Sequence, residues 1–309
     1  MDTYITTNPT VTQSVRFKPA NKSLAQHFLV DQKVLKRIVK SADISPGDMV
    51  IEVGPGRGIM TKLLSKCGAS VIAIEIDRYL VSSLTSIFKD DDSVKILSGD
   101  ARKINLVDVV PSTKPYKVVA NLPYYAAAPI IRRFLQTNHK PQLMVVMLQR
   151  EVAKSMAAPQ GKMGLMSVAT QLYGEPRIVS YVPPRAFHPS PKVTSAILRI
   201  DVHPKLAVDC DSEDDFFKLV RAGFSSPRKQ IRNSLRHGLS ISSDLADGIL
   251  SKANLDPKRR PQTLSLKEWA QLYNSFSTFS IHTEQNLSPG KKGDRRPADC
   301  GIDSSTENQ

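Results

Sequence analysis

Cysteine is scarce in this sequence. Its 309 residues include only Cys67, Cys210 and Cys300, which lie far apart and form no CxxC pair. Neither a disulfide-stapled scaffold nor a cysteine-based metal site can be built from such a set, because both need paired or closely spaced thiols. We therefore expect no bound metal. The first nine residues also lack the basic and apolar stretches of a secretory signal, so we expect a cytoplasmic protein.

Long hydrophobic runs and acidic residues are also in short supply. No stretch is long and apolar enough to predict a membrane span, and no lysine- and arginine-rich amphipathic helix suits an anionic membrane surface. The 43 Lys and Arg residues outnumber the 29 Asp and Glu residues, which gives a net charge of +14 and a pI near 9.7. Because a basic surface attracts polyanions, nucleic acid is the expected partner.

Length and local composition predict two folded domains between polar ends. Residues 1–22 have no hydrophobic periodicity and are predicted to form a flexible arm, and residues 280–309 a disordered polar tail. Between these ends we expect an α/β domain at residues 23–205 and a small all-helical domain at residues 206–279.

Short β-branched runs alternate with stretches of helical spacing in the larger domain. The predicted strands are residues 49–53, 71–76, 94–97, 117–120 and 143–148. The predicted helices between them are residues 59–67, 78–88 and 130–136. This alternation predicts a Rossmann-like, doubly wound parallel sheet. Residues 177–182 and 192–202 resemble an antiparallel hairpin at its end.

Three glycines follow the first predicted strand, at Gly54, Gly56 and Gly58. Glycine there lets the chain turn sharply and approach a ligand. A dinucleotide favours a GxGxxG spacing, whereas S-adenosylmethionine, which carries no phosphate, tolerates GxGxG. Glu75 and Asp100 follow the next two strands, where carboxylates could accept hydrogen bonds from a cofactor's ribose and adenine amine. The alternative interpretation is purely structural: the glycines form a tight turn, Glu75 is a solvated strand end, and Asp100 caps a helix.

The fourth predicted strand ends in Asn121-Leu122-Pro123-Tyr124. An adenine N6 is a poor nucleophile because its lone pair is delocalised into the ring. The Asn121 side-chain oxygen and the Leu122 carbonyl could each accept one N–H, which would localise that lone pair and aim it at a methyl donor. Pro123 restricts the backbone, and Tyr124 offers a ring face for stacking the base. An ordinary turn after a strand is the alternative reading, but this strand end favours amine methylation over hydride transfer.

A proline-rich loop at residues 183–193 carries a second candidate aromatic, Phe187. Prolines on both sides would make the loop stiff, so Phe187 could form the wall of a base pocket opposite Tyr124. It could equally be a core phenylalanine in a connection. His188 has no partner visible in the sequence.

Taken together, these segments resemble the KsgA-type ribosomal RNA adenine N6,N6-dimethyltransferases, from about residue 24 to residue 273. The matching motifs, in order, are residues 26–29, 54–58, 121–124, 149–153 and 187–193. The resemblance implies the Rossmann-like sheet of class I methyltransferases, S-adenosylmethionine as cofactor, and a C-terminal helical domain that binds RNA. The helical segment is most similar to the housekeeping branch. That branch would methylate two adjacent adenosines near the 3′ end of small-subunit rRNA, each twice, within a pre-30S-type particle.

Residue roles follow from the same resemblance. The implied cofactor-binding residues are His27, Leu29, Gly54, Gly56, Glu75, Asp100 and Asn121. Many members have asparagine at the position of His27, although an imidazole can also form a hydrogen bond. The implied catalytic residues are Asn121, Leu122, Pro123, Tyr124 and Phe187. We expect the chain to act as a monomer.

The helical segment from Phe216 to Arg260 is strongly basic, with ten Lys and Arg against three Asp. Such an excess suits contacts with RNA phosphates, although it could be only a solvated face. The predicted RNA-binding residues are Arg221, Arg228, Lys229, Arg232 and Arg236. The competing interpretations are a large-subunit rRNA methylase of the resistance type, a non-catalytic RNA-binding or transcription factor, and a nicotinamide oxidoreductase.

Overall fold

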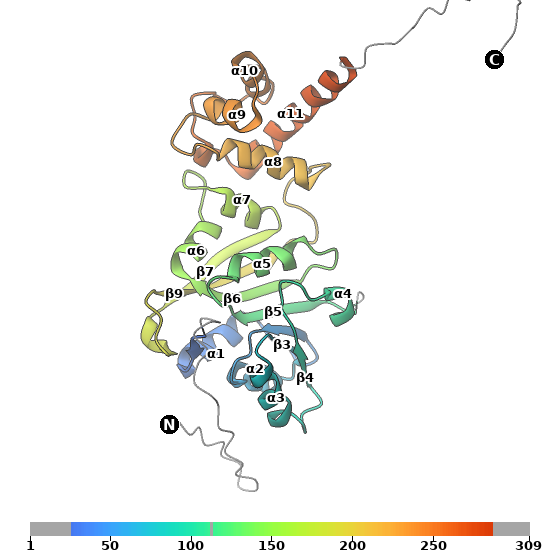
Figure 1. The fold of residues 1–309 in the computed structure, drawn as a ribbon, viewed down its shortest axis with the longest axis vertical. Coiled ribbons are helices and arrows are strands. Elements are labelled where there is room, and N and C mark those ends of the chain that lie inside the picture. Colours follow the sequence, from blue (N-terminus) through green and yellow to red (C-terminus); the bar gives the residue numbers. More distant parts are fainter. Residues whose placement is uncertain (1–25, 112–113, 287–309) are drawn as a thin grey trace, which may run out of the picture.

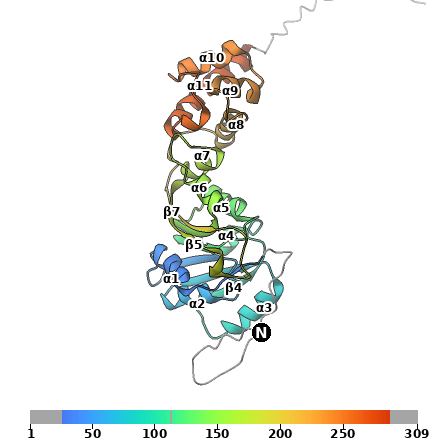
Figure 2. The same cartoon turned by 90° about the vertical axis from the view of Figure 1, so that its left-hand side faces the viewer.

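A computed structural model describes residues 26–111 and 114–286, with side chains described as far as residue 278. The predicted N-terminal arm, residues 1–22, and the tail from residue 287 onward lie outside the described residues. Figure 1 shows the sheet and its helices in the lower part of the molecule and a further group of helices at the upper end. Figure 2, turned by 90°, shows the same end-to-end arrangement, so the molecule is elongated.

The centre of the larger part is a seven-stranded sheet with the order β4-β3-β2-β5-β6-β9-β7. Its strands are β2 (Met49–Val53), β3 (Ser70–Glu75), β4 (Val94–Ser98), β5 (Tyr116–Asn121), β6 (Leu143–Gln149), β7 (Gly174–Val182) and β9 (Ser195–Val202). The five strands from β2 to β6 are mutually parallel, and β9 runs antiparallel to both β6 and β7. The Rossmann-like sheet and the terminal antiparallel pair predicted from the sequence are therefore confirmed.

Helices cover both faces of this sheet. They are α1 (Gln32–Ser41), α2 (Ile59–Lys66), α3 (Arg78–Ile87), α4 (Leu106–Val109), α5 (Ala127–Gln136), α6 (Arg150–Met156) and α7 (Leu165–Gln171). One buried cluster joins α1 and α2 to one face, and a larger cluster joins α5, α6 and α7 to the other. Because alternate residues of a strand point to opposite faces, Val119 lies in the first cluster and Val118 and Ala120 in the second.

The smaller part contains α8 (Glu213–Gly223), α9 (Ile231–Leu239), α10 (Ser243–Lys252) and α11 (Leu266–Asn286). Trp269 is fully buried at its centre and packs against the ring of Phe224, with 5.2 Å between ring centroids. The larger sheet cluster continues into these helices, because Tyr173 beside the sheet stacks on Phe217 of α8 at 6.5 Å. The two parts thus share one hydrophobic core.

The last helix extends beyond the predicted domain boundary at residue 279. Its backbone continues to Asn286, so residues 280–286 are helical here and do not belong to an irregular tail. Extending an existing helix costs less than nucleating a new one, which explains how a polar sequence can remain helical there. Within the described residues, none of the helices has the length and apolarity needed to cross a membrane.

Candidate active site

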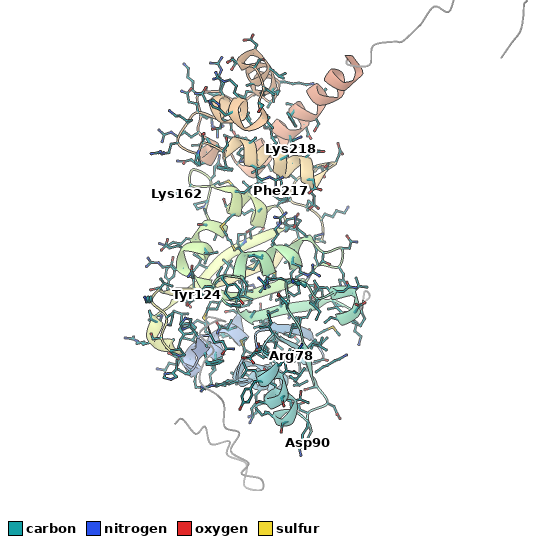
Figure 3. The ribbon with its side chains drawn as sticks, viewed as in Figure 1. Arg78, Asp90, Tyr124, Lys162, Phe217 and Lys218 are labelled. Atoms are coloured by element: carbon teal, nitrogen blue, oxygen red, sulfur yellow. The ribbon has the colours of Figure 1, made fainter. Side chains whose placement is uncertain are left out.

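The predicted catalytic and cofactor-binding residues, except Leu29, line one cleft at the carboxyl ends of β2, β3, β4 and β5. The cleft contains about 860 Å³ of space open to solvent. Its lining includes His27, Phe28, Gly54, Gly56, Glu75, Ile76, Asp100, Arg102, Asn121, Leu122, Pro123, Tyr124, Tyr125 and Phe187. Tyr124 lies in the lower part of the molecule, away from the helices at the upper end (Figure 3). Parallel sheets of this type bind ligands at this edge.

The glycine loop leaves β2 and turns directly into α2. Gly54, Gly56 and Gly58 all have positive φ angles, of 70°, 59° and 76°, which other residues adopt only with strain. A Cβ atom on Gly56 would lie 3.1 Å from the ring of Phe28, so this turn also needs a small residue for space. The backbone N–H of Gly56 donates to Glu75 at 3.2 Å.

Glu75, at the end of β3, is held in place by the backbone. Besides the bond from Gly56, its other carboxylate oxygen accepts N–H bonds from Ile76 and Asp77 at 2.9 and 3.0 Å. Burial raises the pKa of this carboxyl, and those backbone bonds oppose the shift. The carboxylate is thus oriented towards the cleft before any ligand contacts it, as a group that accepts hydrogen bonds from ribose hydroxyls should be.

Asp100, after β4, is paired with an arginine that sequence reasoning did not single out. Arg102 donates from Nη2 at 2.7 Å and from Nε at 3.0 and 3.1 Å. The bond from Arg102 lowers the pKa of Asp100, so this carboxyl stays ionised. The guanidinium of Arg102 also lies 5.7 Å from the ring centroid of Tyr125, which is 51% exposed.

Asn121 is the last residue of β5, and its amide is oriented by the N-terminal segment. Its Nδ2 donates to the backbone carbonyl of His27 at 3.2 Å, and no described residue forms a hydrogen bond with its side-chain oxygen, which can accept an N–H. Leu122 is buried, and its N–H donates to Met147 of β6 at 3.0 Å. These bonds fix the start of the loop at the strand end.

Tyr124 is positioned from two sides. Its hydroxyl shares a 2.7 Å hydrogen bond with Ser195, a fully buried residue of β9, and its ring stacks on His27 with 5.9 Å between centroids. Burial raises the pKa of the Tyr124 phenol, which keeps it protonated. The His27 ring in turn donates from Nδ1 to the carbonyl of Pro189 at 2.8 Å. His27 therefore links the N-terminal segment, the catalytic loop and the proline-rich loop.

A two-stranded sheet brings the first and last predicted motifs together. Its strands are β1 (Phe28–Leu29) and β8 (Phe187–His188), and they pair Leu29 with Phe187. Phe187 is buried and lines the cleft, and the ring stacked on Tyr124 belongs to His27. Leu29 does not line this cleft, because its side chain is buried in the core cluster that contains α1 and α2.

The five predicted RNA-binding residues all lie on α8, α9 or the connection between them, at Arg221, Arg228, Lys229, Arg232 and Arg236. Arg232 forms a 2.6 Å ion pair with Asp247 of α10, and Arg236 donates to Ser243 at 3.2 Å. Arg228 and Lys229 are exposed on the connection itself. Arg221, in the last turn of α8, is exposed as well, so exposed positive charge lies at the corner between α8 and α9.

Sequence reasoning missed several residues of the site. Phe28, Ile76, Arg102 and Tyr125 all line the cleft. Each directly follows or lies two residues beyond a residue that was predicted, so their nearness in sequence is a signal that could have found them. The sequence does not predict that their side chains point into the cleft, because only the folded chain shows which way a side chain points. In the described ranges, no group of three His, Cys, Asp or Glu side chains could hold a metal ion.

The geometry suits S-adenosylmethionine. Two carboxylates, Glu75 and Asp100, end successive strands beside a tight GxGxG turn, a set of acceptors that suits a cationic nucleoside better than a pyrophosphate. Asn121 lies next to that turn, since a Cβ on Gly54 would be 3.6 Å from the Asn121 carbonyl. A Rossmann-like sheet with these strand ends defines the chain as a class I, S-adenosylmethionine-dependent methyltransferase.

Comparison with known proteins places the chain more narrowly. The chain belongs to the ribosomal RNA adenine dimethylase family, whose model matches residues 17–272. The ribosomal RNA small subunit methyltransferase A of Dehalococcoides mccartyi is 46% identical over 253 residues, which is 82% of this chain and 87% of that protein. The protein of the same name from Clostridioides difficile is 39% identical over 273 residues, 87% of this chain and 94% of the relative.

Solved structures share the fold. A dimethyladenosine transferase from Plasmodium falciparum superimposes with a TM-score of 0.69 at 24% identity, covering 82% of this chain and 98% of that one. The 23S rRNA methyltransferase ErmE gives a TM-score of 0.65, also at 24% identity, covering 81% of this chain and 99% of the other. At 24% identity these two neighbours show the fold and not the substrate.

Proposed function

We propose that this chain transfers two methyl groups to the N6 amine of each of two adjacent adenosines near the 3′ end of small-subunit rRNA. The observation that carries the proposal is the orientation of Asn121. Its nitrogen donates to the His27 carbonyl, and its oxygen, which has no partner among the described residues, can accept a hydrogen bond from an amine. The curated relatives that match most of this chain at 39–46% identity are named small-subunit methyltransferases, which supports the choice of substrate.

The chemistry at the amine follows from these groups. S-adenosylmethionine supplies an electrophilic methyl group when bound, with Gly54, Gly56, Glu75 and Asp100 as the residues that would hold it. In the first transfer the Asn121 oxygen and the Leu122 carbonyl each accept a hydrogen bond from one N–H of the adenine amine, which localises its lone pair for attack. In the second transfer the N6-methyl amine has one N–H left, which donates to one of these two acceptors. The amine needs no strong base, because its proton becomes acidic once the methyl group has been added.

The target base would be held between aromatic walls. Tyr124 presents a ring whose hydroxyl is fixed by Ser195, and Phe187 lines the same cleft. Stacking on such a ring contributes about 1–3 kcal/mol per base. An adenosine must leave its helix or loop to reach this cleft, so recognition depends on RNA shape and on extrusion of the base.

The remaining proposals concern the partner. The corner at Arg228 and Lys229, together with Arg221, Arg232 and Arg236, would contact RNA phosphates within a pre-30S-type particle in the cytoplasm. The protein would act as a monomer, since residues of a single chain line the cleft. These contacts read the RNA backbone, while the adenine pocket selects the base.

The test is methyl transfer from labelled S-adenosylmethionine to small-subunit particles from a strain that lacks the modification. We expect two methyl groups on each of two adjacent adenosines near the 3′ end of the RNA. Matched reactions with particles that already carry the modification should incorporate no label. Transfer to free large-subunit RNA with none to the small-subunit particles would overturn the proposal.

A further inference from the structure

A second concave surface adjoins the cleft. An open groove of about 1140 Å³ lies between α4 and α5. In Figure 1, α4 is to the right of α5. Three arginines line the groove, Arg102, Arg132 and Arg133, together with Asn105 and the 71% exposed Val107. No Asp or Glu occurs among its described lining residues. The groove is therefore a positively charged surface outside the helical domain.

The positive charge of the groove is only partly neutralised. Across the described part of the chain, Arg132 and Arg133 form no ion pair with a carboxylate. Arg132 is exposed and its Nε donates to Gln136 one turn later at 2.7 Å, which holds the guanidinium against α5. Arg133 donates to the carbonyl of Ile104 and so fixes α5 against the segment that leads into α4. Arg132 is thus exposed to a ligand and has no carboxylate partner among the described residues.

The groove is continuous with the proposed active site. Arg102 lines both the groove and the cleft, and its guanidinium lies over the exposed ring of Tyr125. Tyr125 directly follows Tyr124, the proposed platform for the target base. Arginines beside an exposed aromatic ring are the combination that binds single-stranded nucleic acid, because arginine contacts phosphate and the ring stacks on a base.

We propose that the groove between α4 and α5 binds the RNA strand next to the target adenosines, with Arg132 and Arg102 on its phosphates and Tyr125 against a flanking base. This groove proposal rests on the proposed function, and it adds an RNA-contacting surface on the part of the chain that contains the sheet. The groove fixes the strand on one side of the extruded base, which orients that base in the cleft. An acidic protein is the competing ligand that the test below separates.

The experiment measures binding of a fluorescent RNA hairpin from the 3′ end of small-subunit rRNA at several salt concentrations. Arg132→Ala should weaken binding about three- to tenfold and lower the slope of log affinity against log salt by about 0.7, the value for one single-strand phosphate. Arg132→Lys should keep the slope, since it keeps the charge. Arg177→Ala, on the exposed edge strand β7, is the matched control and should behave as wild type.

Shortening the RNA locates the contact. Two shortened RNAs are compared, one without the nucleotides on the 5′ side of the adenosines and one without those on the 3′ side. With one of these two RNAs, Arg132→Ala should bind as tightly as wild type. An unchanged slope in Arg132→Ala, or an effect that survives both deletions, would overturn the groove proposal and leave an acidic protein as the ligand to pursue. If the wild type transfers no methyl group to small-subunit RNA, the proposed function fails and the groove proposal fails with it.

Discussion

Asn121 is the residue whose side chain should act most directly on the reacting amine. We expect Asn121→Ala to lower the single-turnover methylation rate by at least about 100-fold, the loss typical of removing one preorganised group that stabilises a transition state. RNA affinity should stay within about twofold, because the large basic surfaces are untouched. Rapid-quench methylation and fluorescence anisotropy on the same RNA measure the two quantities.

Asn274→Ala serves as the control for this variant. Asn274 is exposed on α11, away from the cleft, so its removal should change neither rate nor affinity. Near-normal single-turnover rates in Asn121→Ala would exclude the role proposed for the Asn121 oxygen. A parallel loss of RNA affinity would point to a change in the loop's structure.

Glu52 is a buried carboxyl that the proposed chemistry does not use. It lies on β2 beside the glycine loop and is fully buried. Burial raises its pKa from an ordinary 4.5 to about 8; the nearby Thr61 hydroxyl opposes this shift, and the charge of Glu75 adds to it. Between these two values the folded chain holds a proton that the unfolded chain has released, so the free energy of unfolding falls as pH rises.

Glu52→Gln should therefore remove a pH-dependent loss of stability. The amide keeps the shape of the side chain and cannot ionise, so wild type and variant should differ little near pH 4.5. The variant's advantage should grow by up to about 1.4 kcal/mol per pH unit towards pH 8. Thermal unfolding from pH 4.5 to 8.5 measures the difference. A wild type that is no less stable than the variant at pH 8.5 would contradict the prediction.

Glu268→Gln supplies a contrast of opposite sign. Hydrogen bonds from Arg259 lower the pKa of Glu268 to about 2. Its contribution to stability is present above its ordinary pKa and is lost as pH falls towards the lowered value. This variant should be less stable than wild type at pH 7, and the difference should shrink as the solution is acidified.

At the scale of elements, the junction of β2 and α2 depends on one crowded glycine. Gly58 has a φ of 76°, and a Cβ there would lie 2.9 Å from atoms of both Leu84 and Phe88 on the neighbouring α3 segment. The junction therefore requires glycine both for its backbone conformation and for space. Since the same turn carries Gly54 and Gly56 of the proposed cofactor site, its shape affects binding as well as stability.

Gly58→Ala should lower the free energy of unfolding by about 2–4 kcal/mol, through the strained backbone and the crowding together. Gly161→Ala is a matched control, because Gly161 also has a positive φ, of 90°, and has nothing within 4 Å of its Cβ position. It should cost only about 1–2 kcal/mol, from the backbone strain alone. Chemical denaturation measures both, and equal losses would show that crowding at Gly58 is absorbed without cost.

The sequence predicts the strands of the parallel sheet well and the surface helices less well. Strands such as β6 are buried along nearly their whole length, so their apolar runs stand out without reference to the rest of the chain. Helix α1 was not predicted, although Asp31 caps it with bonds to the N–H groups of Lys33 and Val34. The short helices α6 and α7 have seven residues each, too few for a clear periodicity.

Some features of the candidate site could be predicted from the sequence, and others could not. The strand ends carrying Glu75, Asp100 and Asn121 follow from the strand pattern, because parallel strands bring their carboxyl ends to one edge. The stacking of His27 on Tyr124 and the bond from Tyr124 to Ser195 could not be predicted. They depend on the pairing of the two-residue strands β1 and β8, and on the antiparallel return of β9, which only the folded chain fixes.

At the scale of the whole molecule, the helical part is fixed to the sheet part by more than a linker. The segment between α6 and α7 donates from Gly161 and Met163 to the carbonyl of Gln262, at 3.0 and 3.2 Å. Tyr173 stacks on Phe217 across the same boundary. The basic corner at Arg228 and Lys229 is thus held at a set position relative to the cleft, so the two surfaces can engage different parts of one RNA.

Substituting Arg228 and Lys229 together by Ala should weaken RNA binding and lower its salt dependence, with the chemistry unchanged. If each side chain contacts one phosphate of duplex RNA, the slope of log affinity against log salt should fall by about 1.8. The single-turnover rate at saturating RNA should remain that of wild type, because the shared core keeps the cleft intact. A double variant at Lys62 and Lys66, two exposed lysines of α2, changes the net charge equally and should leave the slope unaltered. If both double variants reduced the slope alike, only the net charge would matter, and the corner between α8 and α9 would have no specific part in docking the RNA.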